Sequence, residues 1–598
     1  MAEVVVFIQV RAYPRRDDSL PGIFLLEIKM SKEKNLNKNA DKCDLKQKKE
    51  NAEPLKIFIA VVPFLIGVYY EWTSCLASMF LLGYLWYCFR MNGKIQIFWS
   101  LPILAAVVIP VAYGISTFWA VDSGMALFGM VKFLSLPLFV LAVQQTGKEE
   151  RESLTDYVPS SGMIMVILSW ILGMVPVLEV HFGVNGRLAG FFQYPNTFAL
   201  YLLVGIIILV SKGQWDKAKV FNIFILFTGI LLTGSRTGFA LLVATVLCFC
   251  FLIREKRVRL GLLGILFLLV AATGIYVVVS GNTGAVGRYL TASFSSSTFL
   301  GRLLYYKDAI PVIFRHPFGL GYMGYYFTQG AFQTGVYSVV NIHNELLQFL
   351  MDIGWIPAGI LIWAVIKGII SGGVKERLII VMILLHSLVD FNLQFLSIFF
   401  VLFSVIVINE KNTGEKLRKS VLVTGVVLIS CVSLYFGLDS ALYYLKQYSA
   451  SAHLYPGNTN AWMQLLVTAE DTEEMDEIAE KILVMNPDNP LANNAKARVS
   501  YANGDFGKMI SYKQAALKYY RYDLEEYLDY FNMLYVGYQL YIENDDPDSA
   551  SICRDQLLKI PNMIEEVLNE TDPLAYRIHD KPELEMPKEY KDILRLLE

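Results

Sequence analysis

The chain has 598 residues, of which 55% are hydrophobic and 18% are charged, and its formal net charge is -2. Soluble domains carry about 25% charged residues and interrupt their apolar runs every few positions. The composition therefore excludes an ordinary soluble protein, and the near-neutral charge gives no reason to expect nucleic acid as a partner.

The N-terminal segment has no feature of a packed domain. "MAEVVVFIQVRAYPRR" contains an apolar run too short for a membrane span, and it lacks the basic start and the cleavage site of a signal peptide. From Met30 onward the segment is rich in lysine. We expect residues 1–54 to form a disordered cytoplasmic tail, in which residues 1–29 are disordered or a start-site artefact.

Long uncharged runs dominate the next part of the chain. The stretches from Phe98 to Ser116 and from Leu260 to Ser280 contain no charge, and each can cross a hydrocarbon core of about 30 Å as a helix. Roughly thirteen such spans are predicted between residues 55 and 437, including one continuous span over residues 344–366. The sequence thus predicts an all-α, polytopic membrane domain over residues 55–437.

The connections between these spans alternate in charge. Loops such as "REKRVR" and "EKNTGEKLRK" are basic, whereas "EWTS" and "DFN" contain no lysine or arginine. Since cytoplasmic loops are enriched in lysine and arginine, the basic set is predicted to be cytoplasmic. That orientation places the turn "TGSRTG", a long loop over residues 281–343 and everything after about Leu438 outside the cytoplasm of a multi-pass plasma-membrane protein.

The long outer loop contains a helical pattern of its own. "GRLLYYKDAIPVIFRHPFGLGYMGYYF" has apolar and aromatic residues at helical spacing, followed by a Pro-Phe-Gly-Leu-Gly break. Such a segment is predicted to lie at the membrane interface as an amphipathic helix. The alternative is that it serves only as a surface anchor.

The composition becomes that of a soluble domain after the last span. "LYPGNTNAWMQLL" and "VMNPDNPLANNAK" repeat a Pro-x-Asn signature, and the segments between and after them have the periodicity of paired helices. The pattern is close to that of tetratricopeptide repeats. We predict an extracytoplasmic tetratricopeptide-like helical domain over residues 445–598, which binds a partner protein or shields the active face.

Polar residues gather where the predicted spans reach the outer face. They are Arg187, Arg236, Arg302, His343, Asn344 and Asp390. An arginine near a span end costs up to about 2.5–3.5 kcal/mol to insert, so one that is kept there usually faces a polar cavity, although snorkelling to the interface is the alternative. Because the arginine fork binds phosphate with two parallel hydrogen bonds, several arginines at headgroup height suggest a diphosphate lipid as substrate.

A histidine at the same height is the natural proton acceptor, because its ordinary pKa is near neutrality. His343 occupies that position, although a histidine at a helix start is often only a structural cap. The seven cysteines show neither a disulfide framework nor metal-ligand spacing. We therefore expect no metal and no cofactor.

The ordered segments "GRLAGFFQYPN", "GSRTGFALL", "GRLLYYKDAIPVIFRHPFGLGYMGY", "HNELLQFLMDIGW" and "HSLVDF" resemble the O-antigen ligase family of membrane glycosyltransferases, over most of residues 100–410. The resemblance implies a multi-helix fold of the GT-C type and metal-independent use of a glycan linked to a polyprenyl diphosphate such as undecaprenyl diphosphate. It also implies that Arg187, Arg236 and Arg302 hold the donor diphosphate and that His343 is catalytic. Asp390 matches a late acidic position near the site.

From these arguments we expect His343 and Arg302 to be catalytic, and Arg187, Arg236, Asn344 and Asp390 to bind substrate. The expected function is transfer of a lipid-linked glycan to an acceptor hydroxyl on a glycan, lipid or protein, in surface-polysaccharide biosynthesis. The alternatives within this class are a polysaccharide polymerase and a protein O-oligosaccharyltransferase. A polytopic transporter or flippase is the alternative of another class, although no internal repeat typical of transporters is visible.

Overall fold

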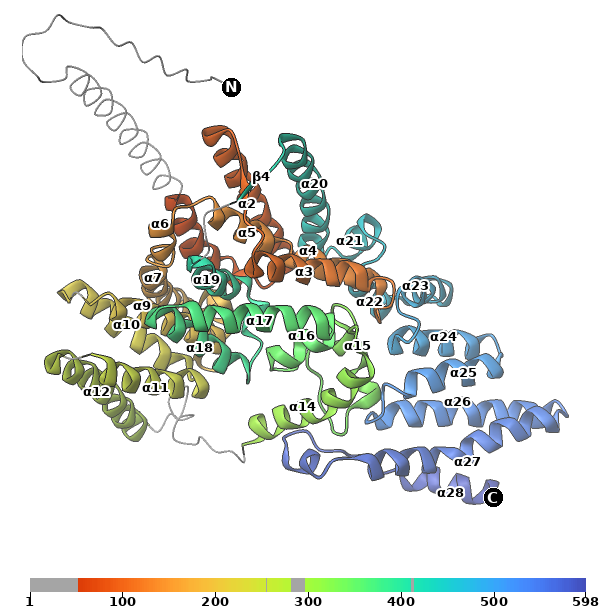
Figure 1. Ribbon diagram of the computed structural model, residues 1–598. Coiled ribbons are helices and arrows are strands. Elements are labelled where there is room, and N and C mark those ends of the chain that lie inside the picture. The colour runs from red at the N-terminus through yellow and green to blue at the C-terminus, as the bar shows by residue number, and fades with distance from the viewer. Residues whose placement is uncertain (1–51, 214, 254, 281–295, 410–413) are drawn as a thin grey trace, which may run out of the picture.

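The structure is a computed structural model that describes residues 52–598, except residues 214, 254, 281–295 and 410–413. This part of the chain is almost entirely helical (Figure 1). Two short antiparallel pairs are the exceptions: β1 (Gln96–Ile97) with β4 (Glu415–Lys416), and β2 (Gly183–Val184) with β3 (Arg187–Leu188). The all-α prediction is confirmed.

Two of the predicted segments fall mostly on residues outside this description. Of the predicted tail 1–54, only residues 52–54 are described, and they begin a helix that continues to residue 61. Of the long loop 281–343, residues 281–295 are likewise outside the described part.

The first half of the described chain is a series of apolar helices joined by short connections. They are α2 (Glu71–Asn92), α3 (Leu101–Ser116), α4 (Ser123–Phe133), α5 (Ser135–Gln144), α6 (Lys148–Glu152), α7 (Val158–Gly173), α8 (Pro176–Phe182), α9 (Pro195–Ser211), α10 (Lys217–Thr233), α11 (Arg236–Leu252) and α12 (Lys256–Ser280), with 3-10 turns at η1 (Val62–Phe64), η2 (Ile66–Val68) and η3 (Gly190–Phe192).

The second group of helices and their connections carry most of the predicted site residues. It comprises α14 (Ser297–Arg315), α15 (Gly324–Phe332), α16 (Glu345–Ile353), α17 (Trp355–Ser371), α18 (Val374–Ser387), η4 (Asn392–Gln394), α19 (Leu396–Ile406), η5 (Val407–Asn409) and α20 (Lys419–Tyr444). The predicted helix in the outer loop is confirmed as α14, and the chain turns at the Pro-Phe-Gly-Leu-Gly break before α15.

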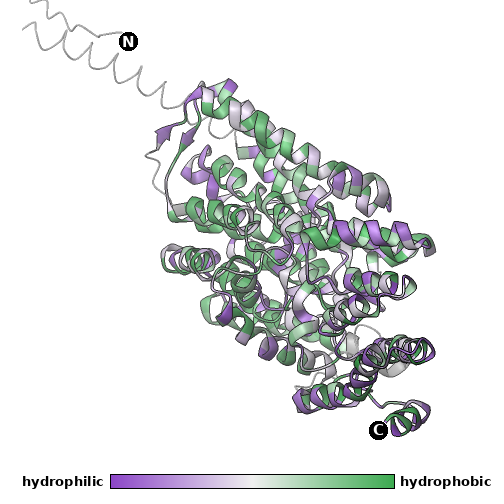
Figure 2. Ribbon diagram, turned by 90° about the vertical axis from the view of Figure 1, so that its right-hand side faces the viewer, coloured by the Kyte–Doolittle hydropathy of each residue, from purple (hydrophilic) through white to green (hydrophobic). Residues whose placement is uncertain are grey.

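The apolar helices indicate a membrane protein. Within the described residues, three helical segments are able to cross a membrane by length and composition: α2, the segment Ser123–Gln144 formed by α4 and α5, and α20. Six further apolar helices of 10–17 residues include α3, α9 and α17. In Figure 2 hydrophobic residues predominate over most of the helical body, whereas the helices nearest the C-terminus alternate between hydrophobic and hydrophilic positions. The number of spans and their orientation stay predictions.

The predicted span over residues 344–366 is not one helix. It consists of α16 and the start of α17, separated by a break at Gly354, where φ is 79°. A Cβ atom on this glycine would lie 2.4 Å from the carbonyl oxygen of Pro317. The close approach of the outer loop therefore requires glycine at this position and separates α16 from the following helix.

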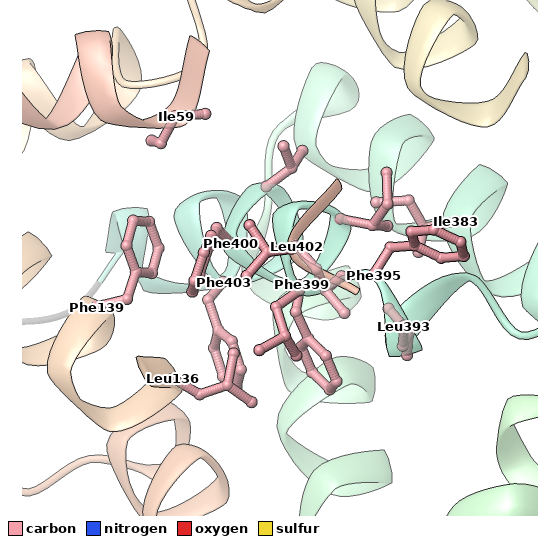
Figure 3. Packing of buried hydrophobic residues seen from close by; sticks show 14 of the residues in the cluster. Ile59, Leu136, Phe139, Ile383, Leu393, Phe395, Phe399, Phe400, Leu402 and Phe403 are labelled. Carbon is pink, nitrogen blue, oxygen red and sulfur yellow. The ribbon is translucent and has the colours of Figure 1, made fainter. Parts of the chain in front are cut away.

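The centre of the helical body is built around α19. Every residue of this helix is buried, and its phenylalanines pack against α5 and neighbouring helices (Figure 3). The rings of Phe139 and Phe400 have centroids 4.8 Å apart. This packing holds η4 and the connection over residues 388–391 in place, and that connection carries Asp390.

The C-terminal part forms a stack of consecutive helices along one side of the molecule (Figure 1). These helices are α21 (Tyr448–Leu454), α22 (Thr459–Thr468), α23 (Thr472–Met485), α24 (Pro490–Ala502), α25 (Phe506–Leu517), α26 (Leu524–Glu543), α27 (Pro547–Glu570), η6 (Pro573–Arg577) and α28 (Lys588–Leu597).

The repeated Pro-x-Asn signature has the same local structure in both places. Asn458 caps α22 by accepting a hydrogen bond from the backbone of Ala461, and Asn489 caps α24 by accepting one from Ala492. The carbonyl groups of Pro456 and Pro487 accept side-chain hydrogen bonds from Trp462 and Asn493 at equivalent positions. The local repeat is therefore real, while the tetratricopeptide assignment stays a prediction.

The end of the C-terminal stack packs against α14. Asp572 forms an ion pair with Lys307, and its backbone N–H donates to the carbonyl oxygen of Thr334 at 2.9 Å. The backbone N–H of His579 donates to the Ser297 hydroxyl at 2.8 Å. The helix that carries Arg302 is therefore held between the membrane helices and the C-terminal stack.

Candidate active site

Asp390 is the centre of a polar network that draws on four separate elements. Its carboxylate accepts hydrogen bonds from the Tyr194 hydroxyl and the Asn196 amide, each at 2.7 Å, and from the backbone N–H of Phe391 at 3.0 Å. Arg302 Nη2 lies 3.4 Å from Oδ2, and His343 Nδ1 lies 3.2 Å from Oδ1. The side chain is only 2% exposed, so its charge is balanced by these partners rather than by water.

The electrostatic balance keeps this carboxylate ionised. Burial alone would raise the pKa of Asp390, but the Arg302 guanidinium and the hydrogen bond with His343 lower it, so that the pKa lies well below its ordinary range. An ionised carboxylate can only accept hydrogen bonds. His343 Nδ1 must therefore carry the proton in this contact, and in the neutral imidazole the lone pair then lies on Nε2.

His343 is held firmly on its other sides. Its backbone has a φ of 58°, and its carbonyl oxygen accepts a hydrogen bond from the Tyr306 hydroxyl at 2.7 Å. The imidazole meets the Phe391 ring edge to face, with centroids 4.8 Å apart. The side chain is 20% exposed. These contacts fix the orientation of the imidazole, while the exposed part of the side chain stays open to an incoming group.

Arg302 reaches the same network from α14. It lies four residues before Tyr306, so both side chains extend from one face of the helix. Burial would lower the pKa of the guanidinium, but the Asp390 carboxylate raises it, so the net pKa lies above its ordinary value. Nε is buried and has no hydrogen-bond partner among the described residues. One donor of this guanidinium is therefore left without a protein partner.

Arg187 contacts the Asp390 network through Asn196 and not directly. Its Nη2 donates to Asn196 Oδ1 at 2.6 Å, and its Nε donates to the carbonyl oxygen of Thr233 at 2.7 Å. Thr233 ends α10, and Arg236 begins α11 after a turn at Gly234 with a φ of 59°. Arg187 thereby connects the turn that carries Arg236 to the Asp390 network.

Both the oxygen and the nitrogen of the Asn344 side-chain amide form hydrogen bonds to the backbone. Its Oδ1 accepts a hydrogen bond from the backbone N–H of Leu347 and so caps α16, and its Nδ2 donates to the carbonyl oxygen of Leu388 at 3.0 Å. These bonds fasten α16 to the connection that carries Asp390. The predicted role of Asn344 in substrate binding stays a prediction.

Three partners in the site were not singled out from the sequence: Tyr194, Asn196 and Tyr306. The first two lie in the quoted segment "GRLAGFFQYPN", and polar groups flanking a proline at a span end are the signal that could have identified them. Glu345 is buried and accepts hydrogen bonds from the backbone of Leu393 and Gln394 at 2.6 and 3.1 Å.

The fold is that of an apolar, helical membrane protein. Its candidate site is a buried carboxylate, Asp390, in contact with Arg302 and with the partly exposed His343. Residues 221–364 of the chain match the family model described as O-antigen ligase. The matched region includes Arg236, Arg302 and His343, whereas Arg187 and Asp390 lie outside it.

The match supports the O-antigen ligase family and a membrane enzyme of the glycosyltransferase type in polysaccharide biosynthesis. None of the curated proteins and none of the solved structures matches the chain at a significant level.

Proposed function

We propose that the protein transfers a glycan from a polyprenyl diphosphate to an acceptor hydroxyl at the extracytoplasmic face of the membrane. The observation that carries this proposal is the contact of one buried, ionised carboxylate with both a histidine and an arginine. The family match supports the reaction type, and the alternation of basic and non-basic loops supports the face.

In the proposed step the acceptor hydroxyl attacks the anomeric carbon of the glycan. The new glycosidic C–O bond forms as the bond between the anomeric carbon and the diphosphate oxygen breaks. Asp390 holds His343 in the tautomer that leaves Nε2 as acceptor, so the hydroxyl proton passes to Nε2. The departing polyprenyl diphosphate carries the bonding electron pair away.

Negative charge on the leaving group is stabilised by the arginines. Arg302 has a donor, Nε, that bonds to no other described residue. Arg187, which donates to the carbonyl oxygen of Thr233, and Arg236, which begins α11 after the same turn, are proposed to add further positive charge. Fixed charges aimed at a developing anion account for much of the acceleration in such sites. We propose that these guanidinium groups make a metal ion unnecessary, and that Asp390 acts by positioning His343 and Arg302.

The acceptor is proposed to be a glycan or lipid at the cell surface, as in a ligase. Growth of the product by repeated addition of the same glycan would instead identify a polymerase, and modification of a protein hydroxyl would identify an oligosaccharyltransferase. The lipid-linked glycan that accumulates when the gene is deleted would supply the donor for all of these assays.

The test is transfer by purified protein with this donor and native membranes as acceptor. His343→Ala should abolish transfer while the protein still binds polyprenyl diphosphate, because only the proton acceptor is lost. His316→Ala is the matched control, since this histidine is exposed at the end of α14 and should be neutral. Full activity of His343→Ala would exclude the histidine from the reaction. Loss of wild-type activity with a chelator would replace the metal-free mechanism with a metal-assisted one.

A further inference from the structure

A cavity of about 310 Å³ lies between the membrane helices and the first helices of the C-terminal stack. Its walls come from α2, α4, α16 and the end of α20 on one side, and from α22 on the other. Its volume is within the range of about 300–1,000 Å³ typical of small-molecule sites, which form preferentially at domain interfaces. None of the predicted site residues lines this cavity.

The lining is unusually rich in tyrosine. Six tyrosine side chains face the cavity: Tyr69, Tyr70, Tyr322, Tyr326, Tyr443 and Tyr444. Each offers a flat apolar face and a polar hydroxyl. The rings of Tyr70 and Tyr444 lie with centroids 4.1 Å apart, so residues from opposite ends of the membrane domain form one aromatic wall.

The remaining polar lining consists mainly of amides. Asn341, Gln348, Gln394, Asn458, Asn460 and Gln464 supply both donors and acceptors. Within the described residues, the hydroxyls of Tyr326 and Tyr443 and the amide of Gln464 form no hydrogen bond to another protein group. These groups are available to a ligand.

The charge of the lining excludes a phosphate group as the occupant. It contains no arginine, and its single cation, Lys132, faces two carboxylates, Glu71 and Asp352. The Lys132 ammonium lies 4.7 Å from the centroid of the Tyr69 ring and 3.4 Å from the Tyr322 hydroxyl. That hydroxyl donates in turn to Glu71 at 2.5 Å. A diphosphate would meet two carboxyl groups and a single amine here, in contrast to the arginines around Asp390.

The cavity is one aromatic layer away from His343. Asn341 lines it two residues before the histidine and donates to the Tyr69 hydroxyl at 3.4 Å. Tyr69 packs against Phe391 with centroids 6.4 Å apart, and Phe391 is the ring that contacts the imidazole. A ligand in the cavity is therefore next to the proposed reaction centre.

We infer that this cavity binds an uncharged sugar residue of the glycan that is transferred or extended. A pyranose has an apolar face of C–H bonds that packs on aromatic rings, and a rim of hydroxyls that exchanges hydrogen bonds with amides and tyrosine hydroxyls. This inference rests on the proposed function for its choice of ligand. In this arrangement the arginines bind the diphosphate, and the cavity lined by the six tyrosines, here called the tyrosine cavity, binds the sugar.

The test uses the full-length protein and the free glycan released by mild acid from the lipid-linked donor. The double variant Tyr326→Phe with Tyr443→Phe removes two hydroxyls that bond to no other described residue, so folding should be preserved. Gln464→Trp fills the cavity from α22. The matched control is Tyr512→Phe with Tyr535→Phe, on helices α25 and α26 outside the cavity.

If the cavity holds a sugar of the donor, both cavity variants should bind the released glycan at least about tenfold more weakly than the control. The double tyrosine variant loses two hydrogen bonds, and Gln464→Trp leaves less room for the sugar. If it holds a sugar of the acceptor, the KM for acceptor should rise about tenfold while the KM for donor is unchanged. In either case binding of polyprenyl diphosphate without sugar should be unaffected.

Two results would overturn the inference: unchanged glycan affinity together with unchanged KM values in both cavity variants, or weaker binding of polyprenyl diphosphate itself. The proposed function is judged separately, by transfer in the wild type and the control variant. A wild-type protein that binds glycan through the cavity but transfers none would refute the proposed reaction and leave the sugar site intact.

Discussion

At the scale of single residues, one carboxylate organises the candidate site. Asp390 is almost completely buried, yet the surrounding donors and the Arg302 guanidinium keep its pKa low. A buried charge without such partners would cost several kcal/mol. The arrangement therefore holds two cationic or proton-carrying side chains in fixed positions at the edge of an apolar helical body.

Arg302→Lys tests whether the guanidinium fork matters beyond its charge. An ammonium keeps the positive charge but loses the two parallel donors that suit a diphosphate, so transfer should fall about a hundredfold or more. The matched control is Arg315→Lys at the exposed end of the same helix, which should retain activity. Equal activity of both variants would show that charge alone is sufficient at position 302.

Asp390→Asn should reveal the depressed pKa through the pH dependence of stability. A carboxylate whose pKa is lower in the folded protein than in the unfolded chain stabilises the fold above its unfolded pKa of about 3.9, and this stabilisation is lost as the pH falls toward the folded value. The difference in Tm between wild type and variant should therefore be steady from about pH 7 to 5 and shrink below about pH 4.

The same comparison in a His343→Ala background removes the hydrogen bond between the imidazole and Asp390, so that Arg302 is the main group left to lower the pKa of the carboxyl. A Tm difference that grows on acidification in that background would contradict the assigned direction of the Asp390 pKa.

At the scale of elements, the break at Gly354 makes α16, the helix that follows His343, a separate element from α17. Asn344 caps α16, and Gly354 ends it where the outer loop passes close to the backbone. A continuous helix would leave no room for the loop segment around Pro317. The short helix α16 is thus a separate element that begins directly after His343 and Asn344.

Gly354→Ala should disturb the break between α16 and α17. The substitution places a side chain at a φ of 79° and within 2.4 Å of a carbonyl oxygen, so we expect a loss of roughly 1–3 kcal/mol in stability and reduced transfer. Gly359→Ala is the control, because a Cβ atom there meets nothing within 4 Å and the position is in the interior of α17. Thermal unfolding in detergent measures both, and equal Tm values would refute the steric argument.

At the scale of the whole molecule, the C-terminal stack covers the site side of the membrane helices. It packs against α14 through Asp572 and closes the tyrosine cavity with α22. Both contacts require the stack and the outer loop to be on the same side of the membrane. That this shared side is extracytoplasmic stays a prediction from loop charge.

Fusions to a reporter enzyme that is active only outside the cytoplasm test this orientation. A reporter fused after residue 445 should be active, and one fused after Arg259 should be inactive, because Arg259 lies in the basic segment "REKRVR". A reporter active only inside the cytoplasm provides the complementary control. Cytoplasmic activity at residue 445 would place the C-terminal stack on the wrong side for the proposed function.

The sequence by itself determined the all-α class, the apolar helices, the helix of the outer loop and the polar residues at the outer face. These features depend on composition and periodicity over short stretches, which are visible in any single chain. His343 and the arginines were found because polar side chains are rare and conspicuous among apolar ones.

Only the tertiary structure decided which of these residues meet. Tyr194 and Asp390 are 196 positions apart in the chain, and Arg302 and Asp390 are 88 apart, yet they share one network. Such pairings follow from how α9, α14, α18 and α19 pack, and no local pattern specifies that packing. The tyrosine cavity escaped sequence reasoning for the same reason, since its walls come from helices distant in the chain that become neighbours only when the C-terminal stack docks.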